Sequence, residues 1–257
     1  YAYPWVRPPQ EVYTSNPITA LTGIDVLYQT TIGGADFLFQ PYVGTSKGEK
    51  ALVPQESMAS YDAAFGTSYN GTNRAVYVDF EAKNFIGFNT SIGTDDFTVR
   101  AGYLQTDVSV VDFGVSDDGV TFSSLGFTAD WNDIVIYSEY FEREIKDAAN
   151  SAFPNQKGWY ATLGYRINKF LPHITFARMK DNDNPTNVAE CGGAPFTCGT
   201  PLDQESITLG LRYELGAAAA LKFETQQIDP KTGTRGLFMN NTVGDINVTS
   251  VSLDVVF

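Results

Sequence analysis

The amino-acid sequence predicts an all-β fold made of antiparallel hairpins, and three observations support this prediction. Aromatic residues, which favour strands, make up 14% of the 257 residues, with 18 phenylalanines and 14 tyrosines. Charged residues make up only 18% of the sequence, so Glu, Lys and Arg are too few to cover the solvated faces of many helices. Runs that alternate apolar with polar or small residues recur along the chain between short turn signals. This composition excludes a disordered chain and disfavours an all-α fold.

Short turn signals and long polar connections alternate along the chain, as they do in a series of up-and-down hairpins. The short turns are expected at residues 33–36, 93–96, 131–132, 168–169 and 216–219. The long connections are expected roughly at residues 46–81, 110–119, 146–157, 182–204 and 230–246. The strands are expected near residues 23–32, 37–45, 82–92, 97–108, 120–130, 133–145, 158–167, 171–180, 206–215, 219–229 and 247–257. A helical turn or two is expected only around residues 56–64.

The predicted strands have the length and the alternation of membrane-spanning strands. About eleven strands of about ten residues each match the length that a tilted strand needs to cross a bilayer. In the last strand Val251, Leu253 and Val255 fall on one face, whereas Ser252 and Asp254 fall on the other. A membrane barrel turns its apolar face outward, but a soluble sandwich also alternates. Aromatic residues near the strand ends resemble interfacial girdles and favour the barrel. These residues are Tyr28, Phe37, Phe97, Tyr103, Tyr140, Tyr165, Tyr213 and Phe257.

The net charge and the cysteines restrict the partners and the compartment. A formal net charge of −13 would repel phosphate backbones, so nucleic acid is excluded as a partner. Cys191 and Cys198 lie in a turn-rich polar segment, which predicts a local disulfide and therefore an oxidising compartment. Two reduced surface thiols are the alternative. A zinc site is not expected, because these two cysteines and the distant His173 do not make a tetrahedral ligand set.

The end of the sequence carries a resemblance to a known family. Val251-Ser-Leu-Asp-Val-Val-Phe257 resembles the closing strand of Gram-negative outer-membrane proteins, whose terminal aromatic residue, here Phe257, is the signal for barrel assembly. Together with the hairpin rhythm over residues 23–257, the chain resembles the Gram-negative porins, with the subfamily left open. The resemblance implies an outer-membrane barrel of sixteen strands, usually a homotrimer, that carries small polar solutes and contacts the lipid bilayer and lipopolysaccharide.

The resemblance also gives the hairpins an orientation and residues 1–22 a role. It makes the short turns periplasmic and the long loops extracellular, so an odd strand count implies that upstream strands precede this sequence. Pro4, Pro8, Pro9 and Pro17 argue against a paired strand in residues 1–22, because proline lacks the N–H that a ladder needs. In the family this position holds a loop that folds inward and narrows the pore. An ordinary surface loop is the alternative.

Charged residues on the polar register are expected to line the pore, because a charge that faces lipid is costly. Opposed charges across a pore set ion preference, although these residues could also simply pair with one another. Arg7 and Glu11 are expected at the constriction, and Asp254 lies on the same register as the strand residues. The expected pore-lining residues are Arg7, Glu11, Asp25, Arg100, Glu139, Arg166, Arg212, Glu214, Lys222 and Glu224.

Other functions have weaker support in the sequence. An enzyme is not expected, since His173 is the only histidine and no Gly-x-Ser-x-Gly elbow accompanies it. No cofactor is expected either. The acidic loops at residues 112–118 and 181–184 lack the spacing of a calcium loop, although loosely shared divalent cations stay open there. The main alternative to a porin is a non-conducting barrel that acts as a structural or binding platform, and a soluble secreted sandwich comes third.

Overall fold

A computed structural model describes residues 3–16, 18, 20–53, 58–72, 74–110, 115–146, 155–181, 202–231, 234, 236–238 and 244–256. Twelve strands form one antiparallel sheet. They are β1 (Thr22–Asp25), β2 (Tyr28–Ile32), β3 (Ala35–Leu52), β4 (Tyr77–Gly93), β5 (Phe97–Val110), β6 (Val115–Trp131), β7 (Ile134–Ile145), β8 (Gln156–Tyr165), β9 (Phe170–Asp181), β10 (Asp203–Gly216), β11 (Ala219–Pro230) and β12 (Ile246–Val255). The described helices are α1 (Gln10–Tyr13) and α2 (Met58–Phe65). None of the helices in the described ranges has the length and apolarity to cross a membrane.

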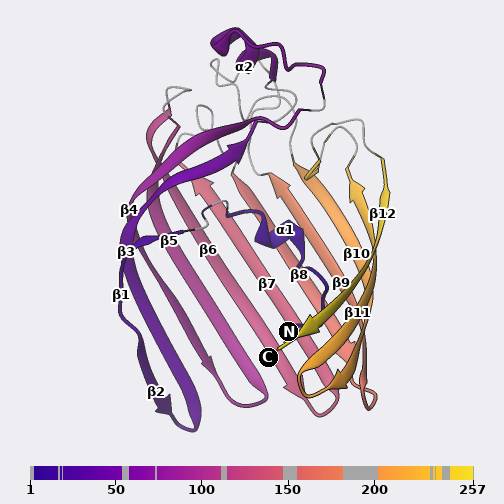
Figure 1. The fold of residues 1–257 in the computed structure, drawn as a ribbon. Coiled ribbons are helices and arrows are strands. Elements are labelled where there is room, and N and C mark those ends of the chain that lie inside the picture. Colours follow the sequence, from indigo (N-terminus) through magenta and orange to yellow (C-terminus); the bar gives the residue numbers. More distant parts are fainter. Residues whose placement is uncertain are drawn as a thin grey trace.

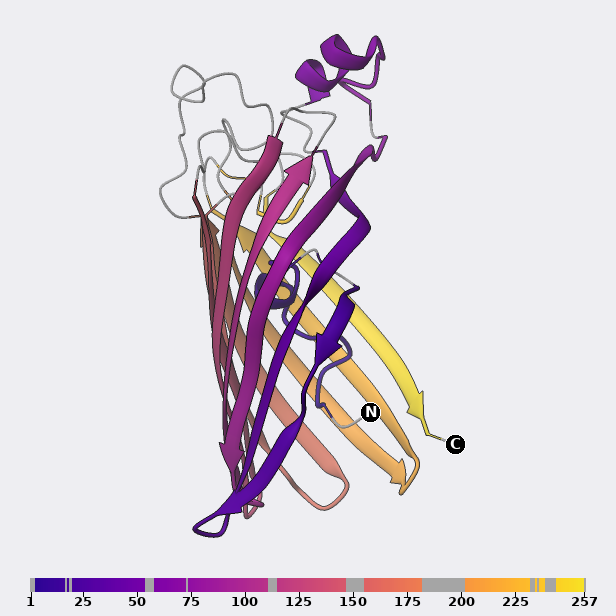
Figure 2. The same ribbon diagram turned by 90° about the vertical axis from the view of Figure 1, so that its left-hand side faces the viewer.

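The strands follow one another in chain order, and each from β3 onward pairs with the next. The sheet curls into a deep trough with β1 and β2 at one side and β12 at the other (Figure 1). Short turns join the strands at one end, and longer connections join them at the other (Figures 1 and 2). This arrangement confirms the predicted all-β, up-and-down barrel architecture, although the sheet does not close between β1 and β12 in the described residues.

One expected strand is divided in two, so the sheet has twelve strands instead of about eleven. Residues 23–32 form β1 and β2, which both pair with β3 on either side of Val26 and Leu27. The backbone N–H of Val26 donates to Pro41 O at 3.1 Å, but Pro41 has no N–H to return the bond. A proline in the partner strand therefore interrupts the ladder at this point.

The two faces of the sheet have opposite character. Directly opposed residues of an antiparallel pair share a face, so the register assigns each side chain to the convex or the concave side. On β12 the convex residues Val251, Leu253 and Val255 are 54–60% exposed. Polar side chains on the concave side of the neighbouring strands are buried, among them Thr208, Lys222 and Glu224. The convex face of the sheet is therefore apolar and exposed, whereas the concave face carries buried polar side chains.

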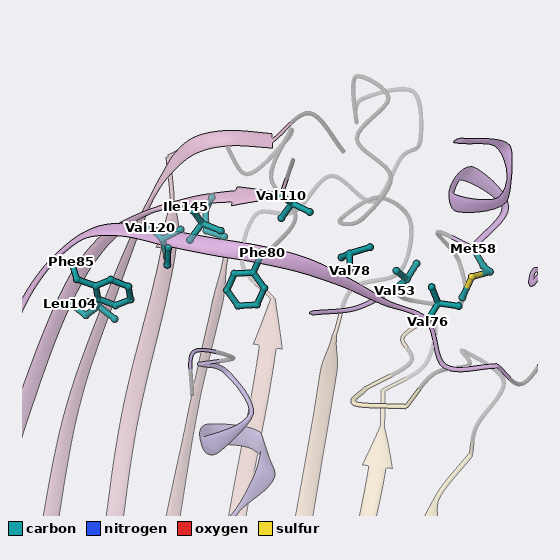
Figure 3. Packing of buried hydrophobic residues seen from close by; sticks show 12 residues of the cluster. Val53, Met58, Val76, Val78, Phe80, Phe85, Leu104, Val110, Val120 and Ile145 are labelled. Atoms are coloured by element: carbon teal, nitrogen blue, oxygen red, sulfur yellow. The ribbon is translucent and has the colours of Figure 1, made fainter. Parts of the chain in front are cut away.

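The end of the sheet that carries the long connections has an ordinary apolar core. β3 and β4 run beyond their expected ends and pair as far as Leu52 and Tyr77, with register shifts between Gly44 and Glu49. The ladder between β4 and β5 shifts between Lys83 and Ile86. Their outer part, residues 46–52 and 77–82, is the upper hairpin. Apolar residues packed between it, α2 and the ends of β5–β7 form the upper cluster (Figure 3). They are Val53, Met58, Val76, Val78, Phe80, Ala82, Phe85, Leu104, Val108, Val110, Val120 and Ile145. Helix α2 lies where the sequence predicted helical structure.

Candidate functional site on the concave face

Residues 3–16, the inner segment, cross the trough on the concave side of β7–β12 (Figures 1 and 2). Pro8 and Pro9 precede the single turn of α1, and Pro9 is its N-terminal flanking residue. Proline suits the start of a helix because the N–H groups of the first turn have no partner within the helix. α1 then contacts β7, β8 and β9. The segment therefore occupies space that faces the inside of the curved wall.

Trp5 anchors the inner segment to the wall. Its side chain is 3% exposed and packs with Val12, Phe141, Tyr160, Ala177 and Met179 in what we call the inner cluster. Its Nε1–H donates to Thr162 Oγ1 and Thr175 Oγ1, both at 3.1 Å. The two hydroxyl oxygens lie 2.7 Å apart on neighbouring strands. A buried tryptophan thus has its apolar ring packed and its polar atom satisfied.

Lys222 and Glu224 hold the main chain of the segment next to Trp5. Lys222 Nζ donates to Trp5 O at 2.9 Å and lies 2.6 Å from Asp254 Oδ2. Glu224 Oε1 accepts a hydrogen bond from the backbone N–H of Val6 at 2.8 Å. Both charged side chains are buried, so each of these bonds compensates part of a desolvation cost.

Three more residues of the inner segment make polar contacts with the wall. Arg7 Nη2 donates to Ser250 Oγ on β12. Glu11 is fully buried, and its Oε1 accepts a hydrogen bond from Gln204 Nε2 at 2.9 Å. Arg143 Nη1 donates to Ser15 O. Contacts from β7 and from β10–β12 therefore fix the segment along one half of the sheet.

The remaining expected pore residues lie along the concave register or at its rim. Arg100 and Glu139 lie on either side of Gly126, on three neighbouring strands. Asp25 Oδ2 accepts a hydrogen bond from Gln40 Nε2 at 2.7 Å. Arg212 is buried and lies 3.2 Å from Glu214 Oε1. Arg166 follows β8 at the short-turn end and makes two bonds to Asp130, at 2.8 and 2.9 Å. Arg212 and Glu214 thus pair with each other, and Arg166 pairs with a carboxylate outside the expected set.

His173 has a packing role in this wall. It lies opposite Gly210 on the concave side, and a Cβ at Gly210 would lie 2.1 Å from His173 Nε2. His173 Nε2 is 3.9 Å from Glu224 Oε1, and Lys222 and the main chain of Pro4 are also near the ring. The ring fills the space that the missing glycine side chain leaves.

Several sequence predictions fall on residues outside the described ranges. These are the disulfide of Cys191 and Cys198, the terminal Phe257, and residues 112–114 and 182–184 of the two acidic loops, all of which stay predictions. The described remainder of these loops is strand instead, since β6 begins at Val115 and β9 ends at Asp181. Within the described ranges, no group of three or more His, Cys, Asp or Glu side chains is arranged to hold a metal ion.

Sequence reasoning identified two charged residues that hold the inner segment, Lys222 and Glu224, but not the uncharged ones. Thr162, Thr175 and Gln204 are uncharged members of alternating strands, so nothing local distinguishes them from other polar residues. Trp5 is the one detectable signal, because a tryptophan between prolines is unusual in an exposed loop.

Comparisons with known proteins match the fold. No protein-family model matches the sequence, and no curated protein sequence resembles it. The structure is similar to Salmonella typhi OmpF in complex with daunomycin, at 10% identity over 90% of this chain and 89% of that chain, with a TM-score of 0.47. It is also similar to the CymD monoaromatic hydrocarbon channel, at 11% identity, 92% and 72% coverage and a TM-score of 0.43. OmpT, an outer membrane protein of Vibrio cholerae, is similar at 12% identity, 90% and 85% coverage and a TM-score of 0.41. These neighbours are Gram-negative outer-membrane β-barrels.

Proposed function

We propose that this chain forms the wall of an outer-membrane porin through which small hydrophilic solutes or ions diffuse passively. The observation that carries the proposal is the inverted distribution of side chains. Ile86, Leu163 and Leu253 are all more than half exposed on the convex face, whereas Lys222 and Glu224 are buried on the concave face. Contact with lipid makes such an exposed apolar face favourable.

The outward aromatic residues support the same placement. Phe170 and Tyr213 stack at 4.7 Å near the short turns, and Tyr140 and Trp159 oppose each other higher on the wall. Rows of aromatic side chains at two heights are typical of the two interfaces of a bilayer. Contacts with lipid and lipopolysaccharide and a homotrimeric assembly belong to this proposal.

The inner segment is the element that would narrow the pore. Its backbone and side chains bond to the strands from β7 to β12, and the concave side of β3–β6 next to it stays open. Selectivity would then follow from the charges beside that opening. Arg166, Arg212 and Lys222 are each paired with a carboxylate, and Glu139 on the same face balances Arg100, so we expect a weak preference for cations in a chain of net charge −13.

Planar-bilayer recording of the purified full chain tests the proposal. We expect stepwise, ohmic openings in potassium chloride and a reversal potential of the sign that cation preference gives in a salt gradient. The variant Glu139→Gln should lower that preference, whereas Asp79→Asn on the exposed upper hairpin should leave it unchanged. Silent bilayers with correctly folded protein would contradict the porin and favour the non-conducting platform.

A further inference from the structure

Two tyrosines of the inner segment differ from their neighbours in exposure. Tyr3 is 47% and Tyr13 is 46% exposed, although Trp5 and Val12 between them are buried. Both tyrosines line a cavity of about 470 Å³ that lies between the inner segment and the concave side of β3–β7. This volume is in the range of roughly 300–1,000 Å³ that ligand pockets occupy.

The two rings are held from behind by other aromatic rings. Tyr3 stacks on Trp5 with 5.5 Å between ring centroids and an interplanar angle of 20°, and it meets the edge of Tyr137 at 5.7 Å. Tyr13 lies 6.2 Å from the buried ring of Tyr160. The cavity therefore has a firm aromatic wall, and binding against such a wall orders few additional side chains.

Small residues form the opposite side of the cavity. Gly102 on β5 and Gly126 on β6 have no side chain there, and Ser124, which lies opposite Gly102 on β6, has a small one. A Cβ on Gly126 would lie 3.6 Å from Arg100 Nε, which is ordinary contact. The glycine at this position leaves room for a ligand without being required by the backbone.

A guanidinium and a carboxylate face the cavity on either side of Gly126. Arg100 makes no hydrogen bond or ion pair with any residue in the described ranges, so its donors are available. Glu139 Oε2 accepts a hydrogen bond from Tyr13 Oη at 3.1 Å. Burial and the charge of Glu139 raise the pKa of Tyr13 to about 12, so the phenol stays a neutral donor. Donors and acceptors therefore converge on one space, and the two full charges cancel.

We propose that this cavity is a binding subsite for neutral sugars inside the pore. A sugar ring has an apolar face of C–H groups that packs against tyrosine, and a rim of hydroxyls that both donate and accept. Arg100 would donate to that rim and Glu139 would accept from it. An ion of either sign would meet one like charge, and a hydrocarbon would leave both polar groups unpaired. The inference rests on the proposed function, since it names a substrate class for the same pore.

Equilibrium binding to the detergent-solubilised full chain tests the subsite without requiring conduction. Sucrose is the neutral probe, gluconate the anionic comparator and benzyl alcohol the aromatic comparator, each followed by calorimetric titration. We expect sucrose to bind with a dissociation constant of about 1 mM and more tightly than either comparator. Tyr3→Ala and Tyr13→Ala should each weaken sucrose binding by about tenfold, because the stacking surface is lost. Tyr77→Ala, at a similarly exposed tyrosine on the upper hairpin, should leave binding unchanged.

A second variant acts by filling the cavity instead of removing its wall. Gly126→Val should abolish sucrose binding while the protein keeps its β-sheet circular dichroism, since a Cβ is tolerated there. Equal sucrose binding by wild type and these variants, or tighter binding of either comparator, would overturn the subsite. Conductance without sucrose binding overturns the subsite alone, and sucrose binding without conductance overturns the porin alone.

Discussion

The interior of this protein is filled in two different ways at its two levels. Near the long connections, the upper cluster packs Val78, Phe80 and Val110 as in a water-soluble core. Nearer the middle of the wall, the inner segment is held by hydrogen bonds and ion pairs around Trp5 and Glu11 as well as by packing. Burial of apolar side chains therefore stabilises the interior near the long connections, whereas hydrogen bonds and ion pairs contribute as well in the middle of the wall.

The comparison shows what the wall of the proposed pore requires. Apolar packing is not directional, so it stabilises the upper end of the sheet without defining where a charge lies. Polar docking on buried Lys222 and Glu224 places the segment at one position and leaves charged groups beside the opening. An element that sets a pore's width and field has to be positioned by such contacts.

Removal of a large side chain from the upper cluster should have the largest effect on stability. Phe80 is 1% exposed, so Phe80→Ala should lower the free energy of unfolding by about 3–5 kcal/mol through lost burial and a residual cavity. Urea titration of protein folded in lipid vesicles measures it. Phe65→Ala, at an exposed phenylalanine of α2, is the matched control and should cost much less. Equal losses for the two variants would mean that the upper cluster is not a core.

Removal of the buried amine should have the next largest effect. Lys222→Met should cost about 2–3 kcal/mol, because Asp254 and Trp5 O lose their partner, and partial exposure of Asp254 moderates the cost. Single-channel recordings should show a noisier open state, since the inner segment loses an anchor. Lys50→Met breaks an exposed pair with Asp79 of similar length and should cost at most about 0.5 kcal/mol. A similar cost for both variants would contradict polar docking.

Loss of the indole N–H should have a smaller effect. Trp5→Phe keeps an aromatic ring but removes the donor to Thr162 and Thr175, whose hydroxyls can still bond to each other. We expect a cost of about 1 kcal/mol by the same urea titration. Trp159→Phe on the convex face serves as the control and should change stability by less.

The smallest effect is confined to α2 and the loop after it. Desolvation acts to raise the pKa of Asp62, but hydrogen bonds from Thr67 Oγ1 and from the N–H groups of Tyr69 and Asn70 outweigh it and lower this pKa. Because the pKa of Asp62 is lowered in the folded state, these hydrogen bonds stabilise the loop fully above the ordinary aspartate pKa. Their contribution is lost as the pH falls through the folded pKa. Hydrogen exchange at Tyr69 and Asn70, corrected for intrinsic rates, should therefore speed up in acid, and Asp62→Asn should remove that pH dependence. Equal acid sensitivity in the variant would assign the loss to other groups.

The faces of the strands could be predicted from the sequence, but their ends could not. Alternation with a period of two places Val251 and Ser252 on opposite faces whatever the rest of the chain does. The polar run around Lys47 and Glu49 looks like a loop on its own, yet it pairs with β4 and extends β3. The break between β1 and β2 depends on Pro41, a residue of the partner strand.

The composition of the candidate site could be predicted better than its contacts. Charge and register select Lys222 and Glu224 without any knowledge of the fold. Their partners Trp5 and Val6 lie more than 200 residues away in the sequence, so no local pattern connects them. Neutral partners such as Thr162 are harder still, because only the position of Trp5 gives their hydroxyls a role.

The central claim is that one side of each strand faces water inside a barrel and the other side faces lipid. Ser124 and Leu125 are neighbours on β6, with Ser124 beside the cavity and Leu125 57% exposed on the convex face. Single cysteines at these two positions, in a chain whose Cys191 and Cys198 are replaced by serine, can be probed in lipid vesicles with a charged thiol reagent. The account predicts that the cysteine of Ser124→Cys reacts and that of Leu125→Cys reacts only after unfolding. Ready reaction at position 125, or protection of position 124, would contradict it.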